Sequence, residues 1–434
     1  MQRISFHSCR LFALCCAVFL AGCASEPRPP ASATITTTPL AQSALTCPPP
    51  FAVLTCPETK PEAALTTPPI ATPEVSRGRL EKASWSALPA WESDDLAPAL
   101  AAFVKGCAVL ATLDSWKDVC ERATMTNAKK SRDIARFFKE NFEPYQVINS
   151  DNSASGLVTG YYEPLLFGSR MRTERYRYPI YAAPQDLLTI DLSSLYPEFK
   201  HRRLRGRFEG NKVVPYYSRS EIDSSAPILK GLELVWVDDV VDLFFLQIQG
   251  SGQVQLENGE RVRVGYADQN GHPFRSLGGL LIRKGEIKPE RASMQGIKEW
   301  ARTNPKKVQD FMNGNPSYVF FKELPGDLSG PIGTLGVPLT AERSIAVDQR
   351  VVPLGVPVYL STTWPNTNAA LNRLMVAQDT GGAINGGVRA DFYWGFGDEA
   401  GKLAGRMKQS GKMWVLLPKG YNPNFEATEA KPPA

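Results

Sequence analysis

The sequence predicts a mainly β fold with peripheral helices, and two patterns carry this prediction. Short apolar runs separated by turn signals fill most of residues 165–325, and a second dense series of such runs follows over 333–417. Runs of this length, bounded by Gly, Pro and Asn, are typical of strands joined by tight turns. Apolar residues at helical spacing occur in fewer segments, beginning with 94–113. Helices are therefore expected to pack around a β framework.

The first 22 residues have the pattern of an export signal. Arg3 and Arg10 supply positive charge, and residues 11–20 form an apolar core too short to span a bilayer. The signal ends in Leu20-Ala21-Gly22-Cys23, which resembles the bacterial lipobox, whose cysteine is lipidated and becomes the mature N-terminus. The two residues after Cys23 are Ala24 and Ser25, and neither is aspartate. The resemblance therefore implies a lipoprotein of the outer membrane, facing the periplasm of a Gram-negative bacterium. The alternative is an ordinary cleaved signal with an incidental cysteine.

Residues 23–80 are predicted to form a disordered tether. Twelve of the 35 prolines fall between residues 26 and 74, with Ala, Thr and Ser between them. Such a composition buries too little apolar surface to fold, and its prolines keep the chain extended. The tether contains Cys47 and Cys56, and the folded part contains Cys107 and Cys120. Export permits disulfides, and either neighbouring pair is a plausible bridge.

The folded body is expected to begin near Ser84. Helices are predicted over 94–113 and from Ser131 onward, each with a core-facing apolar stripe. A strand over 156–162, closed by Pro164, follows and carries Thr159, Tyr161 and Tyr162. Successive strand residues point to opposite faces, so one tyrosine should be buried and the other available for a saccharide. A sheet that merely contains two aromatic residues is the simpler alternative.

The middle of the chain is predicted as short strands followed by two helices, at 290–303 and 305–312. Gln247 and Gln249 are expected on one face of a strand over 243–249, beside the Gly250-Ser251-Gly252 turn. Their amides would either bind N-acetyl and hydroxyl groups or satisfy a sheet edge. The other predicted strands of this part lie at 179–183, 234–237, 252–256, 261–266 and 316–321.

Three aspartates stand out in the C-terminal part. A strand over 374–377 delivers Asp379 to a glycine-rich connection, and the next strand, 390–394, carries Asp391. Apolar neighbours remove water from a carboxyl group and raise its pKa, and a raised pKa supports acid chemistry. Asp398 begins a helix predicted over 398–410, where an acidic side chain favours the helix dipole, so a structural role is expected. Further strands are predicted at 343–348, 356–360 and 413–417, and residues 421–434 form a polar tail.

Composition excludes several other chemistries. The net charge of +5 is mild and no basic stripe is interleaved with aromatic residues, so nucleic acid is not expected as a partner. The three histidines, His7, His201 and His272, have no Cys or carboxylate partners at metal-ligand spacing. No metal or organic cofactor is implied. Carboxylates are therefore the expected proton donors and acceptors.

Several stretches in order resemble the membrane-bound lytic murein transglycosylase A family over about residues 85–418. The family implies a double-psi β-barrel built from 85–164 and 326–420, with a second β domain, 165–325, inserted into it and a substrate groove at the junction. Glu163 departs from the family pattern, because it is acidic at a position where the family is expected to carry a non-acidic residue. Glu163 is therefore not expected to be catalytic. The matching stretches are Thr159-Gly160-Tyr161-Tyr162, Pro179-Ile180-Tyr181, Gln247 to Gly252, Gly265-Tyr266-Ala267, Pro316 to Phe321 and the three-aspartate segment.

The resemblance also implies an activity. Such enzymes cut the β-1,4 bond between N-acetylmuramic acid and N-acetylglucosamine in peptidoglycan without water, because the muramyl C6 hydroxyl attacks its own anomeric carbon. One carboxyl group then serves first as acid and afterwards as base. By resemblance this group is Asp391, supported by Asp379, with Phe392 and Trp394 as an apolar wall. The residues predicted to contact substrate are Thr159, Tyr161, Tyr162, Gln247, Gln249, Ser251 and Trp394.

The sequence leaves three alternatives open. A hydrolytic muramidase would use the same groove, with Asp379 activating water. An aspartic protease would use Asp379-Thr380-Gly381, but the chain holds no second triplet of this kind, and that chemistry needs two aspartates. A non-enzymatic lipoprotein would bind the wall without cleaving it. The expected partners are peptidoglycan strands and the membrane, and no protein of a wall-synthesis complex is identified by the sequence.

Overall fold

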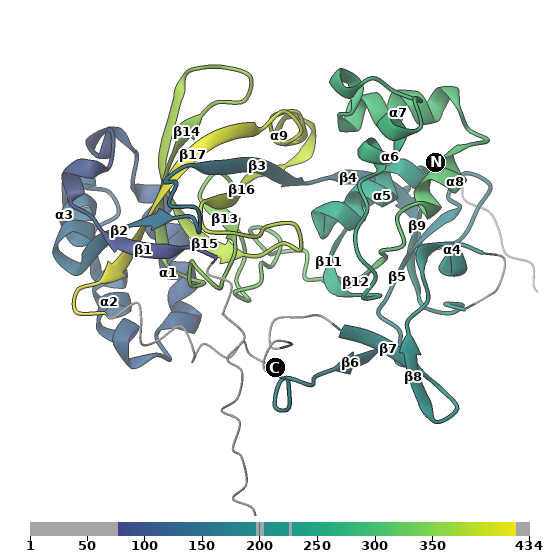
Figure 1. The fold of residues 1–434 in the computed structure, drawn as a ribbon, viewed down its shortest axis with the longest axis horizontal. Helices are drawn as coiled ribbons and strands as arrows, with labels where there is room; N and C mark the ends of the chain where they lie inside the picture. The colour runs from purple at the N-terminus through teal and green to yellow at the C-terminus, as the bar shows by residue number, and fades with distance from the viewer. Residues whose placement is uncertain (1–76, 197–198, 200–203, 225–227, 422–434) are drawn as a thin grey trace, which may run out of the picture. The chain divides into compact units, whose positions relative to one another are not determined.

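The computed structural model of the protein describes residues 77–196, 199, 204–224 and 228–421 (Figure 1). The predicted export signal, the lipobox cysteine Cys23, Cys47, Cys56 and the tail after Tyr421 lie outside these residues. The last residues of the predicted tether lie inside them. Strand β1 already begins at Arg79 and pairs with β2, so the folded body starts earlier than Ser84.

An eight-stranded sheet closes into a barrel. Its strand order is β1-β2-β17-β14-β15-β13-β16-β3, and an additional pairing of β17 with β3 joins six of the strands into a ring. Two of the pairs, β13–β15 and β16–β3, are parallel. The predicted mainly β fold built on a barrel is confirmed. The strands are β1 Arg79–Lys82, β2 Phe142–Ile148, β3 Gly156–Glu163, β13 Ser344–Val347, β14 Pro357–Thr363, β15 Ala370–Asp379, β16 Arg389–Phe396 and β17 Lys408–Pro418.

Helices pack against these strands and share their main core. The rings of Phe103, Phe138 and Phe142 are fully buried, and the Phe142 centroid lies 5.7 Å from each of the other two. Burying an aromatic side chain of this size contributes about 1.5–3 kcal/mol. Figure 1 shows α1 and α3 beside β1 and β2. The helices of this part are α1 Ala97–Leu110, α2 Asp114–Met125, α3 Ser131–Asn141 and α9 Gly397–Ala404, with 3-10 turns Trp85–Ala87 and Trp91–Ser93.

The helices differ from the prediction at two places. Helix α2 was not predicted. Helix α9 ends at Ala404 and not at residue 410, because Lys408, Gln409 and Ser410 already belong to β17. These three residues pair with β3 and thereby close the barrel. The long-range pairing outweighs the local helical pattern.

A disulfide joins Cys107 of α1 to Cys120 of α2. It closes a loop with a sequence separation of 13 residues, a size for which constraint of the unfolded chain contributes about 3 kcal/mol. We expect Cys107→Ala/Cys120→Ala to lower the free energy of unfolding by about 2–3 kcal/mol in denaturant titrations. A reducing agent should abolish the difference between the two proteins. An unchanged stability in the absence of reductant would contradict this role.

A second β structure occupies the middle of the chain. Six strands follow the order β12-β11-β10-β4-β9-β5, and a bridge between Ala182 and Phe321 brings its two ends together, which makes the sheet barrel-like. A separate three-stranded sheet has the order β6-β7-β8. The strands are β4 Leu165–Ser169, β5 Tyr178–Tyr181, β6 Leu188–Ile190, β7 Leu204–Glu209, β8 Lys212–Pro215, β9 Glu233–Val237, β10 Ser251–Leu256, β11 Arg261–Gln269 and β12 Val319–Leu324.

The predicted strand over 243–249 is a helix, α5. The Asp239 side chain accepts hydrogen bonds from the Val241 and Asp242 amides, and Gly250 ends the helix at φ +78°. A short apolar run is compatible with either a buried strand or a buried helix. Here the Asp239 and Gly250 caps favour the helix. The helices of this part are α4 Arg219–Ile222, α5 Val240–Gln249, α6 Leu277–Arg283, α7 Met294–Thr303 and α8 Val308–Asn313, with a 3-10 turn Pro289–Arg291.

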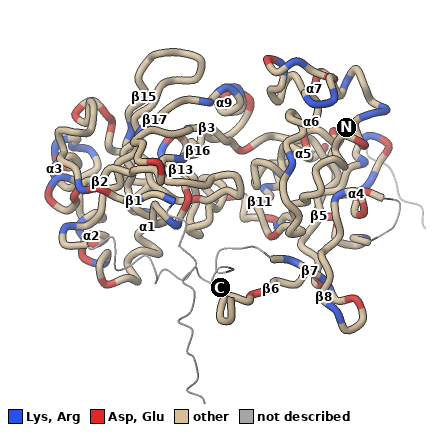
Figure 2. The backbone as a smooth tube through the Cα atoms, viewed as in Figure 1, with Lys and Arg blue, Asp and Glu red and all other residues tan. Residues whose placement is uncertain are grey.

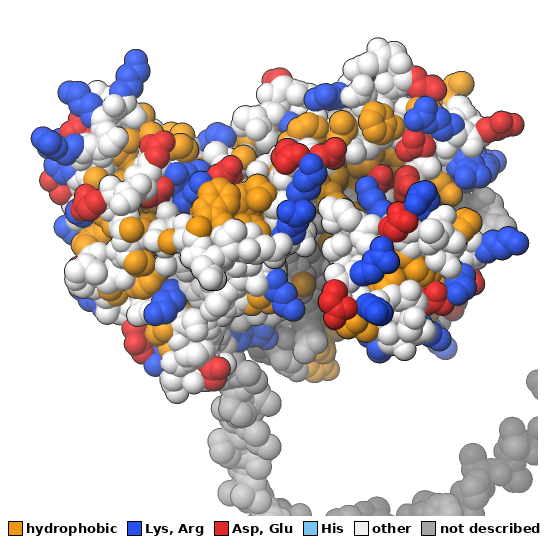
Figure 3. Space-filling view, turned by 90° about the horizontal axis from the view of Figure 1, so that it is seen from above, with side chains coloured by type: hydrophobic (Ala, Val, Ile, Leu, Met, Phe, Trp, Pro, Cys, Tyr) orange, Lys and Arg blue, Asp and Glu red, His pale blue; other side chains and the backbone are white. Residues whose placement is uncertain are grey.

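The surface of the described residues mixes charges of both signs. Figure 2 shows Lys and Arg interspersed with Asp and Glu along the chain, in keeping with the net charge of +5. On the face shown in Figure 3, hydrophobic side chains lie in patches between charged ones. Among the helices that the structure describes, each is too short or too polar to cross a membrane.

Candidate active site

One row of paired residues crosses four strands of the barrel and carries two of the three aspartates. Asp379 on β15 is paired with Ala346 on β13, Ala346 with Asp391 on β16, and Asp391 with Thr159 on β3. Neighbouring strands lie about 4.8 Å apart, so the Cα atoms of the two aspartates are about 10 Å apart. The small side chain between them leaves the two carboxylates as the principal polar groups of the row.

This row lies on the strand face that carries a small apolar cluster of its own. Ala346 packs there with Tyr161, Leu339, Ile384 and Tyr393. The ring centroids of Tyr161 and Tyr393 lie 5.2 Å apart. The low-dielectric surroundings of the carboxylates come from this cluster.

Phe392 and Trp394 do not form the predicted wall beside Asp391. They alternate with it along β16 and belong to the main core, where Trp394 is only 4% exposed and its ring lies 4.5 Å from that of Phe392. The Trp394 indole nitrogen donates to Met407 Sδ. Strand alternation therefore turns Trp394 away from Asp391 and from any substrate held beside it.

The Asp379 carboxylate accepts four hydrogen bonds. Its Oδ1 receives the Thr334 amide at 3.0 Å, the Thr334 hydroxyl at 2.9 Å and the Thr380 amide at 2.9 Å. Its Oδ2 receives the Tyr161 hydroxyl at 3.1 Å. Burial raises the pKa of Asp379, and these hydrogen bonds oppose the rise because they favour the charged form. The arrangement holds a carboxylate in a fixed orientation.

Asp391 has fewer stabilising contacts. Its Oδ1 accepts a hydrogen bond of 2.5 Å from the Thr159 hydroxyl. Burial raises the pKa of Asp391 to about 6, and the negative charge of Asp379 contributes to the rise, whereas Thr159 and the Arg389 cation oppose it. A carboxyl group with this pKa exchanges protons readily near neutral pH, which is what a general acid and base requires.

Replacing Thr159 with valine tests this balance. The variant loses the hydrogen bond that favours ionised Asp391, so the pKa of Asp391 should rise. If Asp391 acts as an acid, we expect the alkaline limb of the pH–rate profile to move to higher pH. The maximal rate should fall by no more than about tenfold, the equivalent of one hydrogen bond. A limb that stays in place, or moves to lower pH, would show that Thr159 does not tune this group.

Both tyrosines of β3 are buried, which corrects the expectation that one is available. Tyr161 is 8% and Tyr162 7% exposed. Tyr161 donates to Asp379, and the Tyr162 hydroxyl donates to Met294 Sδ on α7 at 3.2 Å. The strand does direct them to opposite faces, but both faces are covered.

The polar residues predicted from the Gln247 to Gly252 stretch have internal partners. Gln247 is buried and accepts a hydrogen bond from Arg219, and the Gln249 side chain accepts from the Tyr162 amide at 3.0 Å. Ser251 is buried at the start of β10, paired with Gly265. These contacts hold α5 and β10 in place, and the amide of Gln247 is not presented to a groove.

The remaining acidic candidates have structural surroundings. Asp398 is exposed in the first turn of α9, as predicted, and does not join the row of the other two aspartates. Glu163, at the end of β3, is 1% exposed and pairs with Arg263 of β11 at 2.8 Å. Its other oxygen accepts from Gln253 at 3.1 Å. A buried, fully paired carboxylate of this kind links two sheets and agrees with the expectation that Glu163 is not catalytic.

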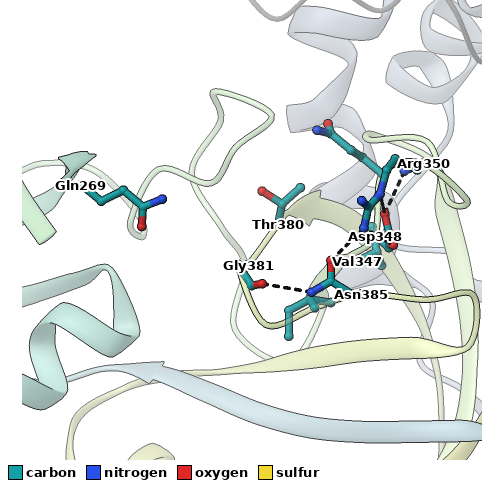
Figure 4. Close-up of a pocket in the computed structure, with 10 residues that line it drawn as sticks. Gln269, Val347, Asp348, Arg350, Thr380, Gly381 and Asn385 are labelled. Carbon is teal, nitrogen blue, oxygen red and sulfur yellow. Dashed lines mark hydrogen bonds and ion pairs between the residues drawn. The ribbon is translucent and has the colours of Figure 1, made fainter. Parts of the chain in front are cut away.

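A polar pocket of about 250 Å³ continues from the Asp379 segment (Figure 4). Thr380 and Gly382 line it, and Figure 4 shows the Gln269 amide on the side opposite Arg350 and Asn385. The Arg350 guanidinium donates to the Asn385 side chain at 2.7 Å. It also forms two hydrogen bonds, of 2.6 and 2.7 Å, to the carboxylate of Asp348. The sequence predicts Asp348 only as the end of a strand, because nothing local links it to Asn385.

The described residues include no group of three or more His, Cys, Asp and Glu side chains placed to hold a metal ion. The donors and acceptors that converge on the row are two carboxylates, hydroxyls and backbone amides. Such a set can transfer a proton and orient hydroxyl-rich ligands through hydrogen bonds.

Comparisons with known proteins match both the middle and the C-terminal part. Residues 157–322 match a family model described as the MltA specific insert domain, and residues 343–417 match one described as the 3D domain. The membrane-bound lytic murein transglycosylase A of Escherichia coli (strain K12) is 34% identical over 281 residues, which are 63% of this chain and 69% of that protein.

Solved structures agree with these matches. A crystal structure of MltA from Neisseria gonorrhoeae is 41% identical, with a TM-score of 0.71 and coverage of 79% of this chain and 93% of that chain. A crystal structure of E. coli MltA with bound chitohexaose is 26% identical, with a TM-score of 0.58 and coverage of 75% of this chain and 90% of that chain.

Proposed function

This chain belongs to the membrane-bound lytic murein transglycosylase A family, and we propose that it cleaves peptidoglycan without adding water. The bond cut is the β-1,4 linkage between N-acetylmuramic acid and N-acetylglucosamine, and the product is a 1,6-anhydro-muramyl end. The observation that carries the proposal is the row that pairs Asp391 with Thr159 and, across Ala346, with Asp379. The bound chitohexaose of the E. coli relative supports a carbohydrate substrate.

Asp391 acts as both acid and base in this proposal. Its carboxyl proton passes to the glycosidic oxygen as the bond from that oxygen to the muramyl C1 breaks. The oxygen of the muramyl C6 hydroxyl then bonds to C1, and its proton returns to the Asp391 carboxylate. All atoms are conserved, no water is consumed, and the residue is regenerated. A pKa of about 6 lets both forms of Asp391 exist near neutral pH.

Asp379 supports Asp391 by its charge. Its four hydrogen bonds hold it in place, and its negative charge raises the pKa of Asp391, which keeps the acid protonated. The same charge is suited to stabilise positive charge that develops at C1 as the bond breaks. A single aspartate acting twice is sufficient, because the attacking hydroxyl belongs to the substrate.

We also propose the domain division and the anchoring expected from the sequence. The barrel would be formed by 85–164 and 326–420 and the inserted domain by 165–325, which the membership of the two large sheets supports. Relatives are named membrane-bound. A lipid on Cys23 would hold this protein at the outer membrane, and the proline-rich tether would let it reach the wall. Mass spectrometry of the mature N-terminus tests this anchoring, since an unmodified Cys23 would contradict it.

Digestion of purified cell walls tests the function. The proposal predicts muropeptides that are each lighter by one water than those released by a muramidase. Muropeptides with hydrated, reducing ends would favour the hydrolytic alternative. Binding without any release of muropeptides would favour a wall-binding lipoprotein.

A further inference from the structure

Strand β15 is irregular at the residue before Asp379. Its parallel pairing with β13 runs Ser344 with Val376 and Ile345 with Ala377, and the next pair is Ala346 with Asp379. Gln378 is therefore an extra residue without a partner on β13, which is the definition of a β-bulge.

The bulge decides which way Asp379 points. In a regular strand, residues 377 and 379 lie on the same face. Here Ala377 lies beside Ile345, which faces the main core, whereas Asp379 lies beside Ala346 on the opposite face. In a regular pairing, Gln378 would take the place beside Ala346, and the Asp379 side chain would turn toward the main core and away from Asp391.

The Gln378 side chain is held at both ends although it is completely buried. Its Nε2 donates to the backbone oxygen of Ala102 in α1 at 2.9 Å. Its Oε1 accepts the Ser344 hydroxyl at 2.5 Å, and that hydroxyl accepts the Thr340 amide at 2.8 Å. The chain of bonds ties helix α1 and the start of β13 to the bulge.

The backbone of Gln378 is fixed as well. Its oxygen accepts the Leu335 amide at 3.0 Å. A Cβ on Gly333 would come within 2.5 Å of the same oxygen, so the 333–335 loop fits closely over the bulge. This loop also contains Thr334, which donates twice to Asp379. The bulge and the groups that orient the carboxylate are thus parts of one structure.

We propose that Gln378 is a positioning residue for the reaction: its amide holds the bulge that turns the Asp379 carboxylate toward Asp391. The inference rests on the proposed function. It differs from a purely structural role, in which a buried glutamine would only stabilise the barrel. Gln378 touches no substrate in this account and acts only through Asp379.

The test combines Gln378→Leu, Asp379→Asn and the double variant, assayed on soluble glycan strands across pH. Leucine has a similar volume but lacks the amide nitrogen and the amide oxygen, so the bulge loses both side-chain hydrogen bonds. We expect Gln378→Leu to lower the rate about tenfold or more and to move the alkaline limb to lower pH, as Asp379→Asn does. In the Asp379→Asn background, Gln378→Leu should change the limb no further, because coupled residues are not additive.

A structural role predicts a different pattern. Gln378→Leu would then lower the rate by the same factor in both backgrounds and leave the limb in place, and that result would overturn the proposal. Thr362→Val is the matched control, since Thr362 is also a buried barrel residue whose side chain donates to a backbone oxygen, that of Ser410, at 2.8 Å. It should lower stability without moving the limb.

Two further measurements keep the proposal testable if Gln378→Leu does not fold. Ser344→Ala removes one of the two side-chain bonds and should shift the limb in the same direction by less. Amide hydrogen exchange at Thr334 should become faster in Ser344→Ala, because its acceptor on Asp379 moves away. Unchanged exchange and an unchanged limb in Ser344→Ala would contradict the proposal. If the wild-type protein releases no muropeptides, the proposed function fails, whereas an active wild type with insensitive variants defeats only the role of Gln378.

Discussion

Asp391→Asn should abolish the release of muropeptides at every pH, with a loss of at least about a thousandfold, within the range that a general acid contributes. Asparagine has the shape of aspartate and can still accept the Thr159 hydroxyl bond, so the local structure should survive. What disappears is the proton that goes to the glycosidic oxygen. The measurement is the rate of muropeptide release from purified walls, and Asp398→Asn is the control. Asp398 belongs to the same segment but is exposed in the first turn of α9, so its variant should remain active.

The same substitution should stabilise the protein at neutral and alkaline pH. Since the pKa of Asp391 is raised from 3.8 to about 6 in the fold, its contribution to stability is complete below the lower value and is lost as pH rises through about 6. Asparagine does not ionise. Asp391→Asn should therefore be more stable than the wild type by up to about 3 kcal/mol at about pH 8, and by nothing from this source at about pH 3. Equal pH dependence of unfolding in the two proteins would contradict the raised pKa.

Asp379→Asn should reduce activity and shift its pH dependence. Asparagine can keep the three bonds at Oδ1 and donate to Tyr161, so folding is expected. Removing the negative charge should lower the pKa of Asp391, because that charge contributes to its rise. The alkaline limb of the pH–rate profile should move to lower pH. At pH values above the limb, lowering the pKa of Asp391 by about one reduces the rate about tenfold, since the protonated fraction falls by that factor.

The direction of this shift separates two roles of Asp379. The shift is opposite to that expected for Thr159→Val, which gives an internal control for the sign. If Asp379 activated water as a hydrolytic base, its loss would remove the acidic limb of the profile instead. An alkaline limb that stays where it is in the wild type would exclude electrostatic support of Asp391 by Asp379.

Local patterns were sufficient to predict the strands that carry the site. The apolar runs before Asp379 and around Asp391, with glycines between them, predict two strands that follow one another in the chain, and both are present as β15 and β16. The position of Asp398 at a helix start followed from its sequence neighbours. These features depend on residues close together in the chain, so local sequence patterns are sufficient to predict them.

Features that depend on distant pairing could not be predicted. Ala346 lies between the two aspartates only because β13 pairs with both β15 and β16, and the bulge at Gln378 is visible only in that register. Trp394 is predicted from the sequence to contact substrate, but alternation along β16 directs it to the main core. Gln247 and Gln249 are predicted from the sequence to bind substrate, but Asp239 caps a helix there and both side-chain oxygens accept hydrogen bonds from within the protein.

Digestion of purified walls in heavy-oxygen water, followed by borohydride treatment, tests the central claim most directly. If the muramyl C6 hydroxyl attacks C1 and Asp391 both donates and recovers the proton, the released ends contain no heavy oxygen and resist reduction. Their masses are then those of anhydro-muropeptides. Ends that carry one heavy oxygen and are reduced by borohydride would mean that water attacks C1, and would contradict the non-hydrolytic mechanism.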